Sequence, residues 1–414
     1  MAEKWYKALE EPYYRLHVPK HDFDQHPRDA QKFPLPENVR GIHTKRLGRR
    51  YMFRPGVLVF RQAEMDSELE RILIDEKDAR EFREPLPEGD SASDRKERAR
   101  VSSAQRALDH SDLVSFRLSN PESREPKDDV PAIVEELRRW PGKTWNPWPQ
   151  IVLGIQQDAE YGPALPPSDP PVDLDIEAPT DGPGAGVVVA VIDTGVRPEH
   201  RLLAGRTRIR DDNDLEVIDA EPDGTRDYVA GHGTFVAGVI RQLAPGAEIV
   251  GRGTVRSNGT VSDAEVAGAI DELAEEERID ILNLSLGGYV HDASATGLPC
   301  TTDALQRLRA KHSRVIVVAA AGNDRRTEPF FPAALRDVIG VGATDLQGNR
   351  AWFSNRGPWV DVWTLGVAVS SSYIGPSLTE PGGGLTQLGA TVKWTGTSFA
   401  APRIAGLLAA AMAP

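Results

Sequence analysis

The chain has a single cysteine, Cys300, so no disulfide bond can form within it. Its first residues, MAEKWYKALEEPYYRLHVPKHD, lack the apolar core of a secretory signal peptide. Disulfides and export leaders belong to oxidising compartments, so both absences favour a reducing, cytoplasmic setting. Export by a route that needs no such leader is the alternative.

A positive charge balance and long apolar runs are also missing. The formal net charge is -13, and no basic stripe is interleaved with aromatic residues. No apolar run reaches the ~18 residues that a membrane-spanning helix needs. Because nucleic acids and anionic lipids attract positively charged surfaces, we expect neither nucleic acid nor a membrane as a partner.

The sequence carries no clear signal for a metal or a cofactor. His17, His21 and His26 lie close together, but their spacing matches no standard metal site. Cys300, in TGLPCTTDA, has no second catalytic-looking residue around it and is interpreted as an incidental thiol near a loop. We therefore expect no metal and no cofactor.

The length of 414 residues exceeds what one core usually holds, so two domains are expected. Residues 161–186 are dense in Pro, Gly and Asp and lack apolar periodicity, which predicts a linker. It separates an N-terminal α+β domain, residues 1–160, from an α/β domain, residues 187–414. In the N-terminal part we expect strands at 51–61, 112–118 and 149–155, helices at 67–82 and 130–140, and a mobile loop at 84–107.

After the linker, continuous apolar runs alternate with helical patterns. Such runs are typical of parallel strands that are buried on both faces. Ser262 and Glu265 form a capping-box pattern at the start of one helix. The alternation predicts an α/β fold with a parallel sheet flanked by helices, whose sites lie beyond the carboxyl ends of the strands. Strands are expected to end at Asp193, Gly253, Gly288, Asn323 and Thr344, and helices to cover 261–278 and 302–312.

Three short segments carry an acid, a base and a nucleophile in that order: VVVAVIDTGV with Asp193, GHGTFVAGVI with His232, and GTSFAAPRIAG with Ser398. A serine hydroxyl becomes a nucleophile when a base lies within hydrogen-bond reach and an anion orients that base. The run that begins at Ser398 predicts a helix, whose first N–H groups would stabilise an oxyanion. Alone, each residue is better interpreted as a turn or capping residue, but the ordered set favours catalysis.

The motifs IDTGV, GHGTFVAG and GTSFAAP resemble the three signature blocks of the subtilisin-like serine proteases, or subtilases. The resemblance implies a serine endopeptidase in which Asp193 orients His232, His232 is the base, and Ser398 is the nucleophile. It also implies that the side chain of Asn323 donates to the oxyanion. By the same match an extended polypeptide substrate pairs beside Ser285, Leu286 and Gly287, and the primary specificity pocket is lined by Ala320, Ala321 and Gly322.

These small residues imply a pocket that is open to a sizeable apolar side chain. Phe330 or Phe331, in EPFFPAAL, falls where the family often has a small residue, and Phe330 would shorten the pocket if it pointed inward. Ordinary core packing is the other interpretation of these rings. The sequence departs from the family pattern in three places. A short turn follows the histidine helix, which predicts the loss of a calcium loop, the chain ends soon after Ser398, and the first residues do not resemble a signal peptide.

The N-terminal part has two interpretations. Secreted subtilases carry a small α+β prosegment that blocks the site with its tail, and intramolecular inhibition of that kind is one possibility here. A permanent recognition domain is the other. For the whole chain, the alternative to a protease is a non-catalytic peptide-binding or scaffold protein on the same fold, although such a protein has no need of Asp193, His232, Ser398 and Asn323 together. A lipase or esterase is disfavoured because GTSFA lacks the second glycine of a G-x-S-x-G turn.

Overall fold

The computed structural model describes residues 40–44, 49–119, 129–155, 182–218, 227, 229–257, 259–290, 298–374, 378–379, 385–386 and 390–412. The histidine-rich segment around His21 and most of the expected linker lie outside these residues. Among the described helices, none is both long and apolar enough to cross a bilayer.

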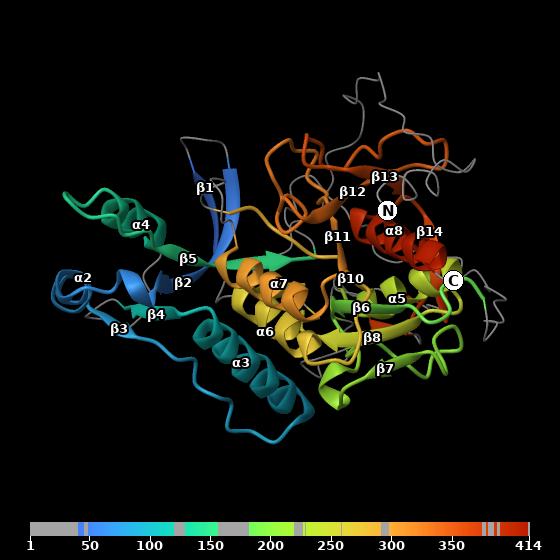
Figure 1. The fold of residues 1–414 in the computed structure, drawn as a ribbon, viewed down its shortest axis with the longest axis horizontal. Coiled ribbons are helices and arrows are strands. Elements are labelled where there is room, and N and C mark those ends of the chain that lie inside the picture. Colours follow the sequence, from blue (N-terminus) through green and yellow to red (C-terminus); the bar gives the residue numbers. More distant parts are fainter. Residues whose placement is uncertain are drawn as a thin grey trace.

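A seven-stranded parallel sheet forms the centre of the C-terminal part, in the order β13-β12-β11-β10-β6-β8-β7 (Figure 1). Its strands come from the continuous apolar runs, because residues on both faces of the sheet are buried. The prediction of a parallel α/β fold is therefore confirmed. The strands are β6 (Val188–Asp193), β7 (Thr207–Ile209), β8 (Glu248–Gly253), β10 (Ile281–Leu284), β11 (Ile316–Ala320), β12 (Val338–Thr344) and β13 (Val362–Leu365).

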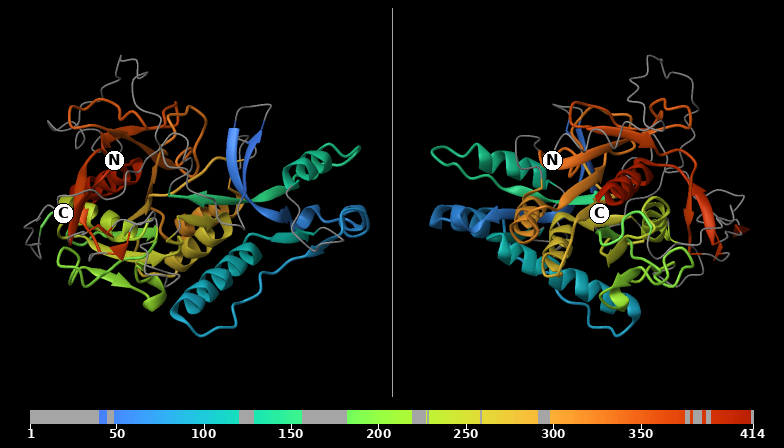
Figure 2. Two further views of the ribbon diagram at one scale, coloured as in Figure 1. Left: turned by 180° about the vertical axis from the view of Figure 1, so that it is seen from behind. Right: turned by 45° about the vertical axis from the view of Figure 1, so that its right-hand side comes forward.

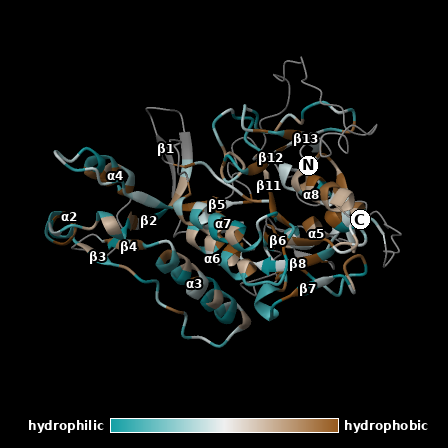
Figure 3. Cartoon of the chain, viewed as in Figure 1, coloured by the Kyte–Doolittle hydropathy of each residue, from teal (hydrophilic) through white to brown (hydrophobic). Residues whose placement is uncertain are grey.

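Two pairs of helices cover the two faces of this sheet. α5 (His232–Leu243) and α8 (Thr397–Met412) share one apolar core with the sheet, while α6 (Asp263–Ala274) and α7 (Pro299–Lys311) share the other. Hydrophobic residues are concentrated on the central strands and on α5 and α8 (Figure 3). An antiparallel ribbon of β14 (Val369–Ser372) and β17 (Thr391–Trp394) precedes α8. A short ribbon, β15 (Leu378–Thr379) with β16 (Leu385–Thr386), lies between them in the sequence.

The N-terminal part builds a second, antiparallel sheet in the order β3-β4-β2-β5-β9, with β1 paired to β2. In both views of Figure 2 the blue and teal elements of this part lie mainly to one side of the molecule. The last strand of the sheet, β9 (Thr260–Ser262), comes from the C-terminal part, so the two parts share one sheet. Their apolar cores are also continuous. The division into domains at the linker stays a prediction. The remaining strands are β1 (Arg40–Thr44), β2 (Arg49–Arg61), β3 (Ala79–Glu81), β4 (Leu113–Leu118) and β5 (Trp148–Gly154).

The prediction of a mobile loop at 84–107 is wrong, because α3 (Ala92–His110) occupies most of this range. A reciprocal capping box between Ser91 and Asp94 starts the helix. Its buried stripe packs on α6, where a Cβ at Gly268 would lie 2.4 Å from Ser103 Oγ. Close packing on α6 therefore stabilises a charged segment whose own apolar pattern is weak.

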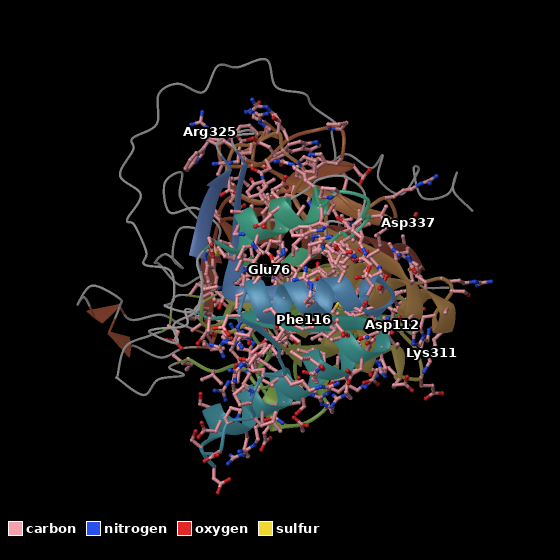
Figure 4. The ribbon with its side chains drawn as sticks, turned by 90° about the vertical axis from the view of Figure 1, so that its left-hand side faces the viewer. Glu76, Asp112, Phe116, Lys311, Arg325 and Asp337 are labelled. Atoms are coloured by element: carbon pink, nitrogen blue, oxygen red, sulfur yellow. The ribbon has the colours of Figure 1, made fainter. Side chains whose placement is uncertain are left out.

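The helix expected at 67–82 is only partly present. It divides into α2 (Ser67–Arg71), a π-helical turn (Ile72–Glu76) and β3, whereas α4 (Val130–Arg138) forms as expected. Three short 3₁₀ and π turns are named η1 (Gln62–Glu64), η2 (the π turn) and η3 (Asp212–Asp214). Figure 4 turns this side toward the viewer, with Glu76 and Phe116 on N-terminal elements near its centre.

Strand β5 positions the N-terminal part against the rest of the chain. It runs between β2 and β9, and its last residue, Gly154, forms an antiparallel bridge with Gly287 just beyond β10. Figure 1 shows β5 extending from the N-terminal sheet toward the parallel sheet. The carboxyl ends of β6, β10 and β11 meet at that place, as the parallel topology requires.

Candidate active site

Asp193 and His232 form a buried hydrogen-bonded pair. Asp193 ends β6, His232 begins α5, and Asp193 Oδ1 lies 2.8 Å from His232 Nδ1. Both side chains are fully buried. The backbone N–H of Thr194 donates to the same carboxylate oxygen at 2.8 Å. The carboxylate is thereby oriented toward the imidazole, with one ring nitrogen left for other chemistry.

The glycines that flank His232 allow this close approach. Gly231 has φ +88°, and a Cβ there would lie 2.4 Å from the ring of Tyr373. A Cβ at Gly233 would lie 2.1 Å from the carbonyl oxygen of Gly195. Gly231 is therefore required both by its positive φ and by the ring packed against it. Gly233 is required only because the neighbouring backbone leaves no room for a Cβ.

The first turn of α5 is capped by side chains from outside the helix. Thr194 Oγ1 accepts from Gly233 N at 2.9 Å, and Glu216 Oε2 accepts from Thr234 N at 3.1 Å. Unpaired N–H groups at a helix start need such acceptors. The residue after Asp193 thus also fixes the helix that carries His232.

Ser398 is the second residue of α8 and is 3% exposed. Its Oγ donates to the backbone oxygen of Ser285 at 3.2 Å, while Ser285 Oγ donates to the backbone oxygen of Ser398 at 2.8 Å. Pro402 lies four residues further on and has no N–H to bond this carbonyl. Ser285 therefore satisfies a helical carbonyl that Pro402 leaves free.

Asn323 is held beside Ser398 by its carboxamide oxygen. Asn323 Oδ1 accepts from Thr397 N at 2.9 Å and from Thr397 Oγ1 at 2.8 Å. The oxygen is thus occupied, which leaves the NH₂ group as the end that can donate. Thr397 itself was not singled out in the sequence, although it determines which end of Asn323 is available.

The imidazole of His232 lies among aromatic rings. The centroids of Trp394 and Phe399 are 5.5 and 5.1 Å from its own. Its Nε2 is buried and has no hydrogen-bond partner within the described part of the chain. Ser398 Oγ is instead hydrogen-bonded to Ser285 O, so His232 and Ser398 are not bonded to each other in this structure.

A small pocket opens next to Ser398. Five of the six residues expected to bind substrate line it, and Ala321 does not; its backbone is bonded to Val341 and Asn355. Gly154 and Ile155, from the N-terminal part, line it as well, and no local signal in the sequence identified them. The lining residues are Gly154, Ile155, Ser285, Leu286, Gly287, Ala320, Gly322, Asn323, Asp324, Phe330, Thr397 and Ser398.

With Gly154 and Ile155 in its wall, the pocket has no room for a sizeable apolar side chain in this structure. Phe330 lies in the pocket wall and is 4% exposed. The remaining cavity measures about 10 Å³, which is the scale of one water molecule. Both interpretations of this ring agree with the structure, because Phe330 lines the pocket and also belongs to the apolar core.

Helix α3 sends Lys96 into the region behind Asp193. Lys96 Nζ donates to Thr194 O at 3.2 Å and to Leu215 O at 2.7 Å. Burial lowers the pKa of Lys96 to about 7 and raises the pKa of Glu216 to about 7. The N-terminal part thus contacts Thr194, which caps the histidine helix, and Leu215, which precedes the second capping residue.

Cys300 is the second residue of α7, and it is 2% exposed. Its backbone N–H donates to Asp263, and burial raises the pKa of its thiol well above the usual range. It is thus a packed thiol of low reactivity. Within the described ranges, no cluster of three His, Cys, Asp or Glu side chains has the arrangement of a metal site.

A family model described as the subtilase family matches residues 184–413, more than half of the chain. The thermostable alkaline protease of Halalkalibacterium halodurans is 34% identical over 237 residues, which cover 55% of this chain and 56% of that protein. Subtilisin DY of Bacillus licheniformis is 31% identical over 242 residues, covering 55% of this chain and 76% of that protein.

A crystal structure of a cold adapted subtilisin-like serine proteinase aligns with 58% of this chain and 80% of that one, at 29% identity and a TM-score of 0.42. The chain spans between 52% and 62% of the length of three curated relatives that it matches. The family match covers Asp193, His232 and Ser398. This chain belongs to the subtilase family, the subtilisin-like serine proteases.

Proposed function

We propose that this protein is a serine endopeptidase that hydrolyses peptide bonds through an acyl-enzyme on Ser398. The buried hydrogen bond between Asp193 Oδ1 and His232 Nδ1, at 2.8 Å, carries the proposal. A proton on Nδ1 leaves Nε2 with a free lone pair. Because Nε2 has no partner among the described residues, it is available to accept a proton from a serine hydroxyl.

In the proposed reaction, Ser398 first rotates away from Ser285 O toward His232. Nε2 takes the hydroxyl proton while Oγ bonds to the carbonyl carbon, and the carbonyl electron pair moves onto oxygen. The NH₂ group of Asn323 and the N–H of Ser398 donate to this oxyanion. His232 then gives its proton to the leaving amine as the C–N bond breaks, and water repeats the sequence to release the acid.

The pairing of β5 supports a binding mode for the polypeptide substrate. Gly154 N donates to Gly287 O at 2.9 Å, and Gly287 N donates to Gly154 O at 3.0 Å. On its other side β5 pairs with β9, and Ile155 N donates to Gly259 O at 3.1 Å. An extended substrate would add between the same two backbones by main-chain hydrogen bonds.

We also propose that the N-terminal part inhibits the enzyme within the same chain. Support comes from Gly154 and Ile155, which line the pocket that contains Ser398. Helix α3 anchors this part through Lys96 and through an ion pair between Glu97 and Arg256. A substrate would therefore have to displace the end of β5 before it reaches Ser398.

The direct test is incubation of the purified chain with an unfolded polypeptide, followed by mass spectrometry of the products. Cleavage at internal peptide bonds, absent in Ser398→Ala, is expected. Cleavage of the chain itself between residues 156 and 181 would show how the inhibition is relieved. Release of terminal residues alone would contradict an endopeptidase.

One observation favours the alternative of a peptide-binding protein without catalysis, namely the bond of Ser398 Oγ to Ser285 O in place of His232. In that case a peptide would bind tightly to the chain and be recovered intact. Comparing peptide recovery from the native chain and from Ser398→Ala separates the two functions, because only a protease gives a difference.

A further inference from the structure

The ring of Phe330 lies between the two glycine segments that form the pocket beside Ser398. A Cβ at Gly287 would lie 2.3 Å from Phe330 Cε1, and a Cβ at Gly322 would lie 3.0 Å from Cδ2 and Cε2. One edge of the ring thus faces Gly287 and the opposite edge faces Gly322. The ring fills the space that two glycines at these positions would otherwise leave open.

Backbone hydrogen bonds fix the segment that carries this ring. Phe331 N donates to Gly288 O at 2.8 Å, and Gly288 N donates to Phe331 O at 2.7 Å. The ring also packs edge-to-face on Tyr289, with centroids 5.2 Å apart. Displacing it would break close packing on three sides, so it acts as a fixed wall rather than a movable gate.

The polar groups beneath the ring strengthen this wall. Tyr289 donates its hydroxyl to Asp324 Oδ2 at 2.8 Å and accepts from Asn355 Nδ2 at 2.9 Å. Asn355 Nδ2 also donates to Ala321 O, and Asn355 Oδ1 accepts from Asp324 N. Tyr289 is thus bonded to both sides of the pocket, and the ring it supports has little freedom to move.

We propose that Phe330 is a specificity-determining residue that restricts the acyl side of the cleaved bond to glycine or alanine. The inference rests on the proposed function, because it concerns the side chain whose carbonyl Ser398 attacks. The ring occupies the space between Gly287 and Gly322, whether or not β5 is in place. A methyl group can lie above it, whereas a leucine or phenylalanine side chain would clash with the ring.

Hydrolysis of matched peptides tests the inference on the full chain. The parent chain carries Gly154→Pro, which removes the N–H that bonds Gly287 O and loosens β5 from the site. The peptides differ only in the residue before the cleaved bond, which is Gly, Ala, Leu or Phe. We expect kcat/KM for Ala to exceed that for Phe by at least about 10-fold, the lower end of what pocket size usually gives.

Three variants separate specificity from stability. Phe330→Ala is expected to lower the Ala-to-Phe ratio by at least about 10-fold, and Phe330→Leu to lower it less while keeping more of the packing. Phe331→Leu changes the neighbouring ring, which is buried but does not line the pocket, and should leave the ratio unchanged. Thermal unfolding of each variant confirms that it is folded.

Binding distinguishes failure of this inference from failure of the proposed function. Product-like peptides that end in Ala or Phe are titrated against the parent carrying Ser398→Ala, with and without Phe330→Ala. Suppose that no peptide is cleaved, that Ala-ended peptides bind more tightly than Phe-ended ones, and that Phe330→Ala removes this preference. The inference about Phe330 is then supported, and the proposed catalytic function is contradicted. Equal acceptance of Ala and Phe by the parent, in hydrolysis or in binding, overturns the inference.

Discussion

Gly154 and Gly287 face each other as an antiparallel pair, with two reciprocal backbone hydrogen bonds of 2.9 and 3.0 Å. One glycine ends β5, the last strand that the N-terminal part contributes to its sheet, and the other follows β10 at the pocket of Ser398. This pair joins the part of the chain that we propose to be inhibitory to the backbone that we propose to bind substrate.

Gly154→Pro should raise the rate at which the full chain hydrolyses an added peptide, by about 10-fold or more. The substitution removes one of the two bonds to Gly287, each worth about 1 kcal/mol, and disturbs the strand geometry. Peptide turnover measures the effect. Gly154→Ala, which keeps the N–H, is the matched control and should change the rate little. An equal rate in the proline variant would argue against inhibition by β5.

Ser285→Ala should destabilise the chain by about 1–3 kcal/mol, because it leaves the buried carbonyl of Ser398 without a donor. Pro402→Ala restores the N–H that a helix normally supplies to that carbonyl. In the double variant the loss from Ser285→Ala should therefore be smaller than in the single variant. Denaturant unfolding gives the free energy of unfolding of four chains: the reference, the two single variants and the double variant. All four carry Ser398→Ala, which prevents self-digestion. Strict additivity would contradict this account of Pro402.

Asn323→Asp should lower kcat by about 10²–10³ and change KM little. That range is the known effect of removing the corresponding donor in subtilisin. The aspartate keeps an oxygen for Thr397 but loses the NH₂ group that we propose to face the oxyanion. Steady-state kinetics give both constants. A rise in KM with kcat intact would show that Asn323 binds substrate and does not stabilise the transition state.

The two buried groups Lys96 and Glu216 should lower the free energy of unfolding most strongly near pH 7. The reference is a variant in which neither position can carry a charge. Burial raises the pKa of Glu216 from 4.5 to about 7, so the folded state holds its proton more tightly and stability falls as pH rises through that window. Burial lowers the pKa of Lys96 from 10.5 to about 7, so stability rises again between about pH 7 and 10.5.

The double variant Lys96→Met, Glu216→Gln in a Ser398→Ala background removes both titrations. Its stability advantage over the Ser398→Ala chain, from denaturant unfolding at pH 5, 7 and 9, should be largest at pH 7. Each pKa unit corresponds to about 1.4 kcal/mol. A constant difference at the three pH values would show that neither group has a shifted pKa.

The sequence predicted the parallel sheet well because its strands are continuous apolar runs that end in small or polar residues. The pairing of Ser262 with Glu265 likewise predicted the start of α6, where the capping box is present. These features are local, so neighbouring residues are enough to recognise them. The cytoplasmic location expected from the single cysteine stays a prediction.

Other features depend on contacts between distant segments and were not evident from local patterns. α3 was expected to be a loop because its stabilising partner, α6, lies far along the chain. Gly154 carries no motif, and its place beside Gly287 follows from the sheet shared with β9. The direction of the Phe330 ring follows from the backbone bonds between Gly288 and Phe331.

The most direct test of the central claim is covalent labelling of Ser398 by a fluorophosphonate, mapped by mass spectrometry, in the full chain carrying Gly154→Pro. We expect one adduct on Ser398, absent in Ser398→Ala and formed at least about 10³-fold more slowly in His232→Ala. Two results would contradict the assignment of Ser398 as the nucleophile. One is a folded Gly154→Pro chain that forms no adduct, and the other is an adduct that still forms when Ser398→Ala is added.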